Sequence, residues 1–270
     1  MNLLRYYLVV ISLFGALTVT AQSDTTTVAP TVVTELEAPT PEVLWDKANT
    51  AYINNDYASA IATYEQILEM GYRSAKLYYN LANSHFKREE LGAAILNYHR
   101  ALRLAPSDED IRHNLSVAES RTKDTIDEIP DFFLATWMRS LAATMGSTAW
   151  TILSLIALAA MLALLLFFLL SKQLSLRKAG FYGTLIALVV LLLATWMAAE
   201  QRKIQLSENE AVVMSNSAAV KSSPDRSATD LFVLHEGTVV QITNRLDGWC
   251  EVVIADGKKG WTEARKIEVI

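Results

Sequence analysis

The sequence contains little sulfur and no familiar catalytic motif. Cys250 is the single cysteine among 270 residues, so an intramolecular disulfide is impossible and each folded part must be held by its hydrophobic core. A phosphate-binding glycine loop and a serine, histidine and aspartate set are both missing. Cys250 has no nearby partner in the sequence and lies in a predicted strand, which indicates an ordinary strand residue rather than a nucleophile. We therefore expect a protein that is not an enzyme and needs no cofactor.

Histidine is also scarce, with four residues in the chain. His85, His99 and His113 recur every 14 residues, which raises the question of a metal site. They fall on three successive predicted helices, and no pair has the spacing that places two ligands on one helical face. Packing or surface roles are expected for them, and no metal.

Neither polar part of the chain has an excess of basic residues. Residues 23–131 contain 18 acidic and 10 basic side chains, and residues 207–270 contain 10 and 7. Proteins that bind nucleic acid concentrate Lys and Arg on one surface, so a nucleic-acid partner is not expected.

Uncharged apolar residues, in contrast, are abundant. They make up 51% of the chain, and the mean hydropathy of +0.21 is high for a purely soluble protein. Residues 150–170 and residues 179–199 each run for 21 positions without a charge. A helix of about 20 residues crosses a hydrocarbon core of roughly 30 Å. The two runs therefore predict two transmembrane helices.

Charges around these runs predict their orientation. The loop 171–178 holds three basic residues and no acid, which is typical of a cytoplasmic loop. Both polar parts would then be exported. Arg202 and Lys203 argue against this orientation, because they follow the second run on the predicted outer side.

The N-terminus reads as a secretory signal peptide over residues 1–21. Arg5 precedes an apolar stretch, and the small residues Val19 and Ala21 have the spacing that a signal peptidase recognises. We interpret it as a cleaved export signal, and the predicted orientation does not depend on cleavage, since an uncleaved segment would also leave the following residues outside. Residues 22–40 are rich in Thr and Pro, which predicts a flexible linker.

From residue 41 the sequence repeats with a period of 34 residues. The two copies, 41–74 and 75–108, share six identical positions, which are Ala48 with Ala82, Asn49 with Asn83, Ala60 with Ala94, Ile61 with Ile95, Tyr64 with Tyr98, and Leu68 with Leu102. This period resembles that of the tetratricopeptide repeat (TPR), a helix-turn-helix unit. Small alanines let two helices approach, and the tyrosines one turn later fill the space between hairpins.

Three features depart from or extend this pattern. His85 stands where the repeat usually has an aromatic residue, and Tyr72 stands where the first copy would have its closing proline. Ser107 with Asp110 predicts a capping-box start for a third helix over residues 108–120. We expect this helix to cap the stack and to complete a TPR domain over residues 41–122.

In the TPR family the first helix of each repeat lines a concave groove that accepts peptides. The resemblance places seven residues there, which are Trp45, Asn49, Ile53, Tyr79, Asn83, Lys87 and His113. Asn49 and Asn83 would each offer an amide donor and acceptor to a bound backbone, while Trp45 and Tyr79 would supply apolar anchors. The alternative is that Trp45 and Tyr79 merely fill the stack.

Between this domain and the first span, residues 131–146 contain Phe132, Phe133 and Trp137 beside Arg139. This composition favours a helix in the outer membrane–water interface. A helical stalk continuous with the span is the alternative.

The last part, residues 207–270, changes to short β-rich runs separated by two Asp-Gly turns. About five strands and a small barrel are predicted. Residues 211–270 resemble the bacterial SH3-like domain, in the Gly-Thr-Val-Val strand, in Trp249 after Asp-Gly, and in Gly260-Trp261. Trp249 and Trp261 are candidates for an aromatic recognition face. For Trp261 a core position is the favoured alternative.

The expected fold is thus multi-domain, with α-helical TPR hairpins, two transmembrane helices and a small all-β SH3-like barrel. This order resembles, over nearly the whole chain, the BatE-like family of the Bacteroides aerotolerance operon. The resemblance implies an inner-membrane protein with both domains in the periplasm and with von Willebrand A-type membrane proteins of the operon as partners. We expect a non-enzymatic adaptor in an aerotolerance or envelope-stress complex. The alternative is a cell-envelope sensor or anchor whose SH3-like domain binds peptidoglycan.

Overall fold

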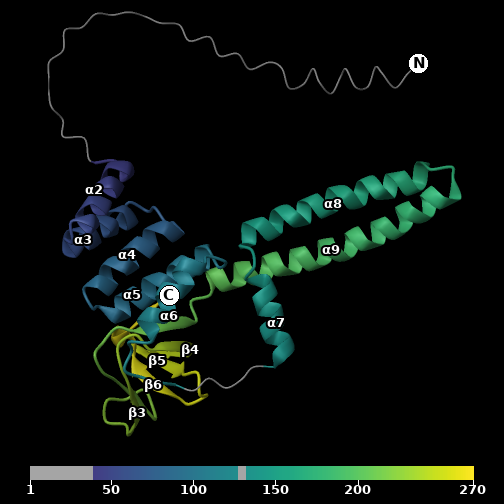
Figure 1. Ribbon diagram of the computed structural model, residues 1–270. Helices are drawn as coiled ribbons and strands as arrows, with labels where there is room; N and C mark the ends of the chain where they lie inside the picture. The colour runs from purple at the N-terminus through teal and green to yellow at the C-terminus, as the bar shows by residue number, and fades with distance from the viewer. Residues whose placement is uncertain (1–38, 127–131) are drawn as a thin grey trace, which may run out of the picture. The chain divides into compact units, whose positions relative to one another are not determined.

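A computed structural model describes residues 39–126 and 132–270. The predicted signal peptide and nearly all of the predicted linker lie outside the described residues. The described helices and strands follow the expected order of helical hairpins, two long apolar helices and a β-sheet (Figure 1). The multi-domain fold class is therefore confirmed.

Five helices form the TPR part, and their ends follow from local capping. They are α2 (Pro41–Ile53), α3 (Tyr57–Glu69), α4 (Ala75–Lys87), α5 (Leu91–Leu104) and α6 (Glu109–Glu119). The side chains of Asp56 and Ser74 accept hydrogen bonds from the first turns of α3 and α4. Helix α6 begins differently from the prediction, because Asp108 rather than Ser107 is its N-cap, with Asp108 Oδ1 3.1 Å from the amide nitrogen of Ile111.

The predicted packing between hairpins is confirmed. Ala60 and Ala94 are fully buried, and Tyr64 and Tyr98 are each 1% exposed. The alanines let paired helices approach closely, and the two rings fill the space that this approach leaves.

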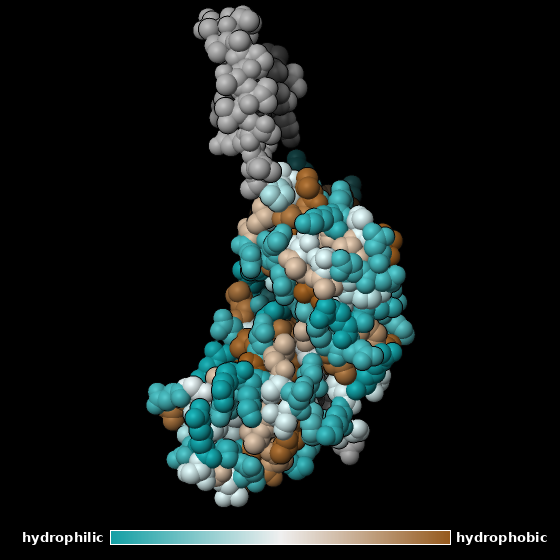
Figure 2. All heavy atoms as spheres, turned by 90° about the vertical axis from the view of Figure 1, so that its left-hand side faces the viewer, coloured by the Kyte–Doolittle hydropathy of each residue, from teal (hydrophilic) through white to brown (hydrophobic). Residues whose placement is uncertain are grey.

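Figure 2 shows one face of the molecule on which hydrophilic residues dominate and hydrophobic residues occur only in small groups.

The turn inside each hairpin has a residue with positive φ at the same repeat position. These residues are Asn55 (φ 61°) and Glu89 (φ 63°), which lie 34 residues apart. Asn tolerates the left-handed region through its short polar side chain, whereas Glu does not. The second hairpin therefore contains a strained turn.

Replacing Glu89 with glycine should relieve this strain. We expect Glu89→Gly to raise the free energy of unfolding by about 1 kcal/mol, because glycine adopts positive φ without a Cβ clash. Thermal unfolding in detergent measures the change. Asn55→Gly is the matched control and should have a smaller effect, since Asn already suits its turn. An equal gain in both variants would contradict the strain at Glu89.

The all-β part covers residues 210–270, all of which are described. It is one antiparallel sheet with the order β3-β2-β6-β5-β4-β1-β7, and it has seven strands rather than about five. The strands are β1 (Glu210–Val213), β2 (Ala218–Lys221), β3 (Asp230–Leu234), β4 (Val239–Leu246), β5 (Trp249–Val253), β6 (Lys259–Glu263) and β7 (Ile267–Val269). Asp247 (φ 44°) and Gly248 (φ 82°) form the tight turn predicted between β4 and β5.

The sheet and the TPR helices share part of their hydrophobic core. Val212 of β1 and Ile270 pack in the same buried cluster as Ile95 and Tyr98 of α5. The amide of Gly92 donates to Glu236 Oε1 at 2.8 Å, and a Cβ at Gly92 would lie 2.9 Å from the Glu236 side chain. The close approach therefore requires glycine at this position.

Two arginines of α5 add polar contacts to this junction. Arg100 donates to Glu268 at 2.9 Å and to the carbonyl oxygen of Val269 at 2.7 Å. Arg103 donates to the carbonyl oxygen of Ser207 at 2.8 Å, directly after α9. Arginine suits such a site because its planar group donates to several acceptors at once. Helix α5 is thus joined to the first and last residues of the SH3-like part, which meet at the β1–β7 edge of the sheet.

Two long apolar helices form the membrane part, α8 (Ser147–Leu170) and α9 (Leu174–Leu206). Both are long and apolar enough to cross a membrane, and they lie side by side as a hairpin (Figure 1). Three buried small residues of α9, Gly180, Ala187 and Ala194, recur every seven positions. Small residues at this spacing let two membrane helices approach closely.

Helix α7 (Phe133–Ala142) precedes this hairpin and is separated from α8 by residues 143–146. It is therefore not continuous with the first span, as a helical stalk would be. The indole nitrogen of Trp150 donates to the carbonyl oxygen of Ala142 at 3.0 Å. Trp150 is consequently buried beneath α7, whereas Trp196 is half exposed on α9.

The segment after α6 is fastened to the SH3-like sheet through Asp124. Its carboxylate accepts hydrogen bonds from the amide of His235 (2.7 Å) and the hydroxyl of Thr238 (2.7 Å), and it pairs with His235 Nδ1 (2.6 Å). Burial alone would raise the pKa of Asp124, but these hydrogen bonds and the His235 ring outweigh it and lower the pKa. The ionised carboxylate is therefore the form that holds the junction.

This pKa shift predicts acid sensitivity. Asp124→Asn should lower the free energy of unfolding by about 1–3 kcal/mol at pH 7, because it removes a hydrogen-bonded charge. The stabilisation is complete above the ordinary Asp pKa of about 3.9 and is lost as the pH falls through the lower folded-state pKa. Urea unfolding of both proteins in detergent at neutral and acid pH measures the difference.

Asp225→Asn is the control for this experiment. The pKa of Asp225 is also lowered, by hydrogen bonds from Ser227, but Asp225 is exposed and bonds only within its own turn. Its replacement should change stability less than Asp124→Asn. A penalty for Asp124→Asn that persists unchanged below both pKa values would contradict the proposed role of the charge.

Candidate functional site

The candidate site is the TPR groove, by which we mean the surface formed by α2, α4 and α6. One set of hydrogen bonds connects its first two helices. The Tyr64 hydroxyl and the Asn80 amide both donate to Asn49 Oδ1, at 2.7 and 3.1 Å. Because Tyr64 comes from α3 and Asn80 from α4, the bonds join three helices at a single oxygen.

The same bonds recur 34 residues later between α4, α5 and α6. The Tyr98 hydroxyl and the Asn114 amide donate to Asn83 Oδ1, at 2.6 and 3.2 Å, and Asn114 also donates to the Tyr79 hydroxyl at 2.8 Å. Burial raises the pKa of Tyr98, so its hydroxyl keeps its proton and acts as a donor. The spacing between groove helices is therefore set by a repeated Tyr–Asn–Asn arrangement.

These bonds change the role predicted for the two asparagines. The carbonyl oxygens of Asn49 and Asn83 each already accept two hydrogen bonds, so they are not free to accept one from a partner's backbone. Their amide nitrogens donate no hydrogen bond to a described residue, so these are the groups that remain available to a partner. The prediction of a donor and an acceptor at each asparagine is therefore wrong for the acceptor.

Three of the predicted residues lie together in one cavity of about 280 Å³, which we call the Tyr79 cavity. Tyr79, Asn83 and Lys87 all project from α4, at the i, i+4 and i+8 spacing that keeps them on one face. The other lining residues are Tyr52, Phe86, Tyr98, Asn114 and Val117. The cavity thus combines aromatic walls with an ammonium group and an amide donor.

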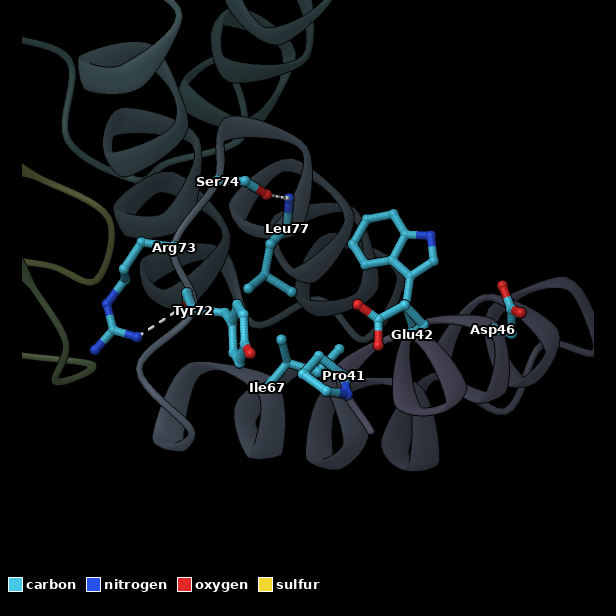
Figure 3. Close-up of a pocket in the computed structure, with 9 residues that line it drawn as sticks. Pro41, Glu42, Asp46, Ile67, Tyr72, Arg73, Ser74 and Leu77 are labelled. Carbon is cyan, nitrogen blue, oxygen red and sulfur yellow. Dashed lines mark hydrogen bonds between the residues drawn. The ribbon is translucent and has the colours of Figure 1, made fainter. Parts of the chain in front are cut away.

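Trp45 lines a different cavity of about 400 Å³, the Trp45 cavity, between the beginnings of α2 and α4 (Figure 3). Its remaining lining residues are Pro41, Glu42, Asp46, Ile67, Tyr72, Arg73, Ser74 and Leu77. In Figure 3, Leu77, Tyr72, Ile67 and Pro41 point toward a common space, and Arg73 and Asp46 lie on opposite sides of it.

Trp45 is both a wall of this cavity and part of the stack. Its ring meets the edge of Tyr64 with centroids 5.8 Å apart, while Lys76 Nζ lies 5.6 Å from its centroid. The half-buried indole therefore packs in the stack and also lines a cavity, and its role as an anchor for a partner stays a prediction. Tyr72 also lines this cavity, which was not predicted. The signal in the sequence was that a tyrosine stands where the repeat usually has its closing proline.

Three predicted groove residues line neither cavity, and one of them is Asn49, whose carbonyl oxygen accepts the hydrogen bonds described above. Ile53 is 76% exposed at the end of α2, and His113 is exposed on α6. Neither lines the Trp45 cavity or the Tyr79 cavity. The helical spacing therefore selected residues that line the two cavities together with residues that lie outside them.

The second candidate surface is the outer face of β5 and β6. Trp249 pairs with Glu263 and Trp261 pairs with Glu251, so all four side chains share one face of the sheet. Both tryptophans are half-buried, and the buried cluster of the sheet contains Cys250 and Val252 instead. The core position favoured for Trp261 is therefore wrong.

The cysteine and a buried histidine of the described residues have structural surroundings. Burial raises the pKa of Cys250, which keeps the thiol protonated. His85 is buried and bonds through Nδ1 to Glu90 at 2.7 Å, which accounts for its place at an aromatic position. Within the described ranges, no group of three or more His, Cys, Asp and Glu residues is arranged to hold a metal ion.

Comparison with protein families agrees with both parts of this description. Residues 46–109 match the tetratricopeptide repeat family, and residues 216–267 match the bacterial SH3 domain family. Comparison with curated proteins gave no significant match. These modules are typically binding modules, and together with α8 and α9 they indicate a membrane-associated protein of the bacterial envelope.

Proposed function

We propose that the protein is a non-enzymatic, membrane-anchored adaptor whose TPR groove binds an extended segment of a partner protein. The observation that carries this proposal is the pair of cavities lined by α2 and α4. The Trp45 cavity offers apolar walls for a bulky side chain. The Tyr79 cavity offers the Lys87 ammonium and the Asn83 amide, which are donors suited to carbonyl or carboxylate oxygens.

The membrane hairpin would hold this groove beside its partner. The predicted signal peptide and the basic loop 171–178 support an inner membrane location with both modules in the periplasm. Tethering raises the effective concentration of a partner that is anchored in the same membrane. The resemblance to the BatE-like family supports von Willebrand A-type membrane proteins as partners and a role in aerotolerance or envelope stress.

Charge reversal at Lys87 tests the groove. Lys87 is exposed and forms no ion pair with a described residue, so Lys87→Glu should leave the fold intact. We expect recovery of co-expressed von Willebrand A-type partners from detergent to fall about tenfold, as for a binding hot spot. Trp45→Ala should reduce recovery through the other cavity.

Lys47→Glu is the matched control, because Lys47 is an exposed lysine of α2 that lines neither cavity. It should recover as much partner as the wild type. Equal recovery with Lys47→Glu and Lys87→Glu, when both proteins show the same thermal unfolding, would remove the Tyr79 cavity from the binding site.

A second function is favoured by the outer face of the SH3-like sheet. Trp249 and Trp261 on one face, alternating with Glu251 and Glu263, suit a ligand with apolar and amino groups. The peptide part of peptidoglycan has this chemistry, and we propose it as the ligand if the module anchors the protein to the cell wall.

Incubation of the detergent-solubilised full chain with purified sacculi tests this function. The full chain is needed because Val212 and Ile270 pack against the TPR helices. We expect the wild type to sediment with sacculi, and Trp249→Ser or Trp261→Ser to lose most of this binding. Val233→Ser, at another exposed apolar position, is the control. Equal sedimentation of all four proteins would exclude the tryptophan face.

A further inference from the structure

One side of helix α7 packs against the two long apolar helices. Met138, Leu141 and Ala142 pack in a small cluster with Trp150 of α8 and Ala194 and Met197 of α9. The hydrogen bond from Trp150 to the carbonyl oxygen of Ala142 fixes the end of the helix against this cluster. The hairpin therefore determines where α7 lies and which way it is turned.

A second side of α7 exposes large apolar side chains. Phe133 is 73% exposed and Trp137 is 58% exposed, and their spacing of four residues places both rings on the same side. Leu134 is exposed as well, and so is Phe132, which directly precedes the helix with its ring centroid 4.9 Å from that of Phe133. Large apolar side chains are stabilised by burial, so leaving this group in water would be unfavourable.

A third side is polar. Thr136 and Ser140 are both exposed, and they lie at the helical positions beside the aromatic pair and away from the packed cluster. A helix with one side on protein, one apolar side and one polar side matches the environment at a membrane surface. In a helix surrounded by water on this side, the exposed apolar side chains would be unfavourable.

The contacts of α7 place it at one end of the membrane hairpin. Ala194 and Met197 lie in the last turns of the uncharged run 179–199, just before Glu200 and Arg202. Trp150 lies in the first turn of α8. The level of α7 along the hairpin is therefore where apolar residues give way to charged ones, which corresponds to the bilayer interface.

We propose that Phe133, Trp137 and their exposed neighbours insert into the boundary between lipid headgroups and acyl chains. The partner of this surface is the bilayer itself, which is continuous with the lipid around α8 and α9. Aromatic rings favour this region because it accommodates an apolar ring together with a polar edge. Helix α7 then fixes the depth and rotation of the hairpin and of the modules attached to it.

Fluorescence quenching of the full chain in phosphatidylcholine vesicles tests this proposal. The chain has six tryptophans, and the difference between the wild type and Trp137→Phe isolates the emission of Trp137. Vesicles containing lipids brominated near the headgroup end of the acyl chain should quench this component several-fold more than lipids brominated near the chain terminus. Iodide, added on both sides of the bilayer, should quench it weakly.

The emission of Trp249, isolated with Trp249→Phe, is the matched control. It should respond to iodide and not to brominated lipid, because it lies on the SH3-like sheet. Strong quenching of Trp137 by iodide would show that its side faces water and would overturn the proposal. Protection of Trp137 from both quenchers would overturn it too, since a second copy or another protein would then cover α7.

Discussion

The groove depends on one repeated interaction, the two hydrogen bonds that meet at an asparagine oxygen. Asn49 Oδ1 joins α2 to α3 and α4, and Asn83 Oδ1 joins α4 to α5 and α6. Removing one of the two donors would leave the oxygen with a single hydrogen bond, at a cost of about 0.5–1.5 kcal/mol. The bonds keep the first helices of the repeats at a fixed spacing, and the two cavities lie between these helices.

A second constraint joins this groove to the SH3-like sheet. Two and a half repeats are fewer than a stable TPR stack normally needs. The SH3-like sheet compensates, because Val212 and Ile270 enter the core beside α5 and Arg103 reaches the residue that follows α9. A partner held in the groove is thereby coupled to the sheet and to a membrane helix through packed contacts. For an adaptor, such packed contacts between the groove, the sheet and α9 would be more suitable than three modules that move independently.

Local features could be predicted from the sequence, whereas contacts between distant segments could not. The 34-residue period, the two apolar runs and the Asp247-Gly248 turn each depend on short-range rules of spacing and backbone conformation. The pairing of Asp124 with His235 joins residues more than 100 positions apart. No local pattern indicates such a pair. The division of the groove surface into two cavities also depends on contacts between helices, so the sequence did not predict it.

The most direct test of the groove as a binding site is site-specific photocrosslinking in native membranes. A photoreactive amino acid at Lys87, inside the Tyr79 cavity, is compared with one at Glu65, which is exposed on α3 and lines neither cavity. Binding in the groove predicts a discrete crosslinked partner from position 87 and little or none from position 65. Equal crosslinking from both positions, or none from position 87, would contradict it.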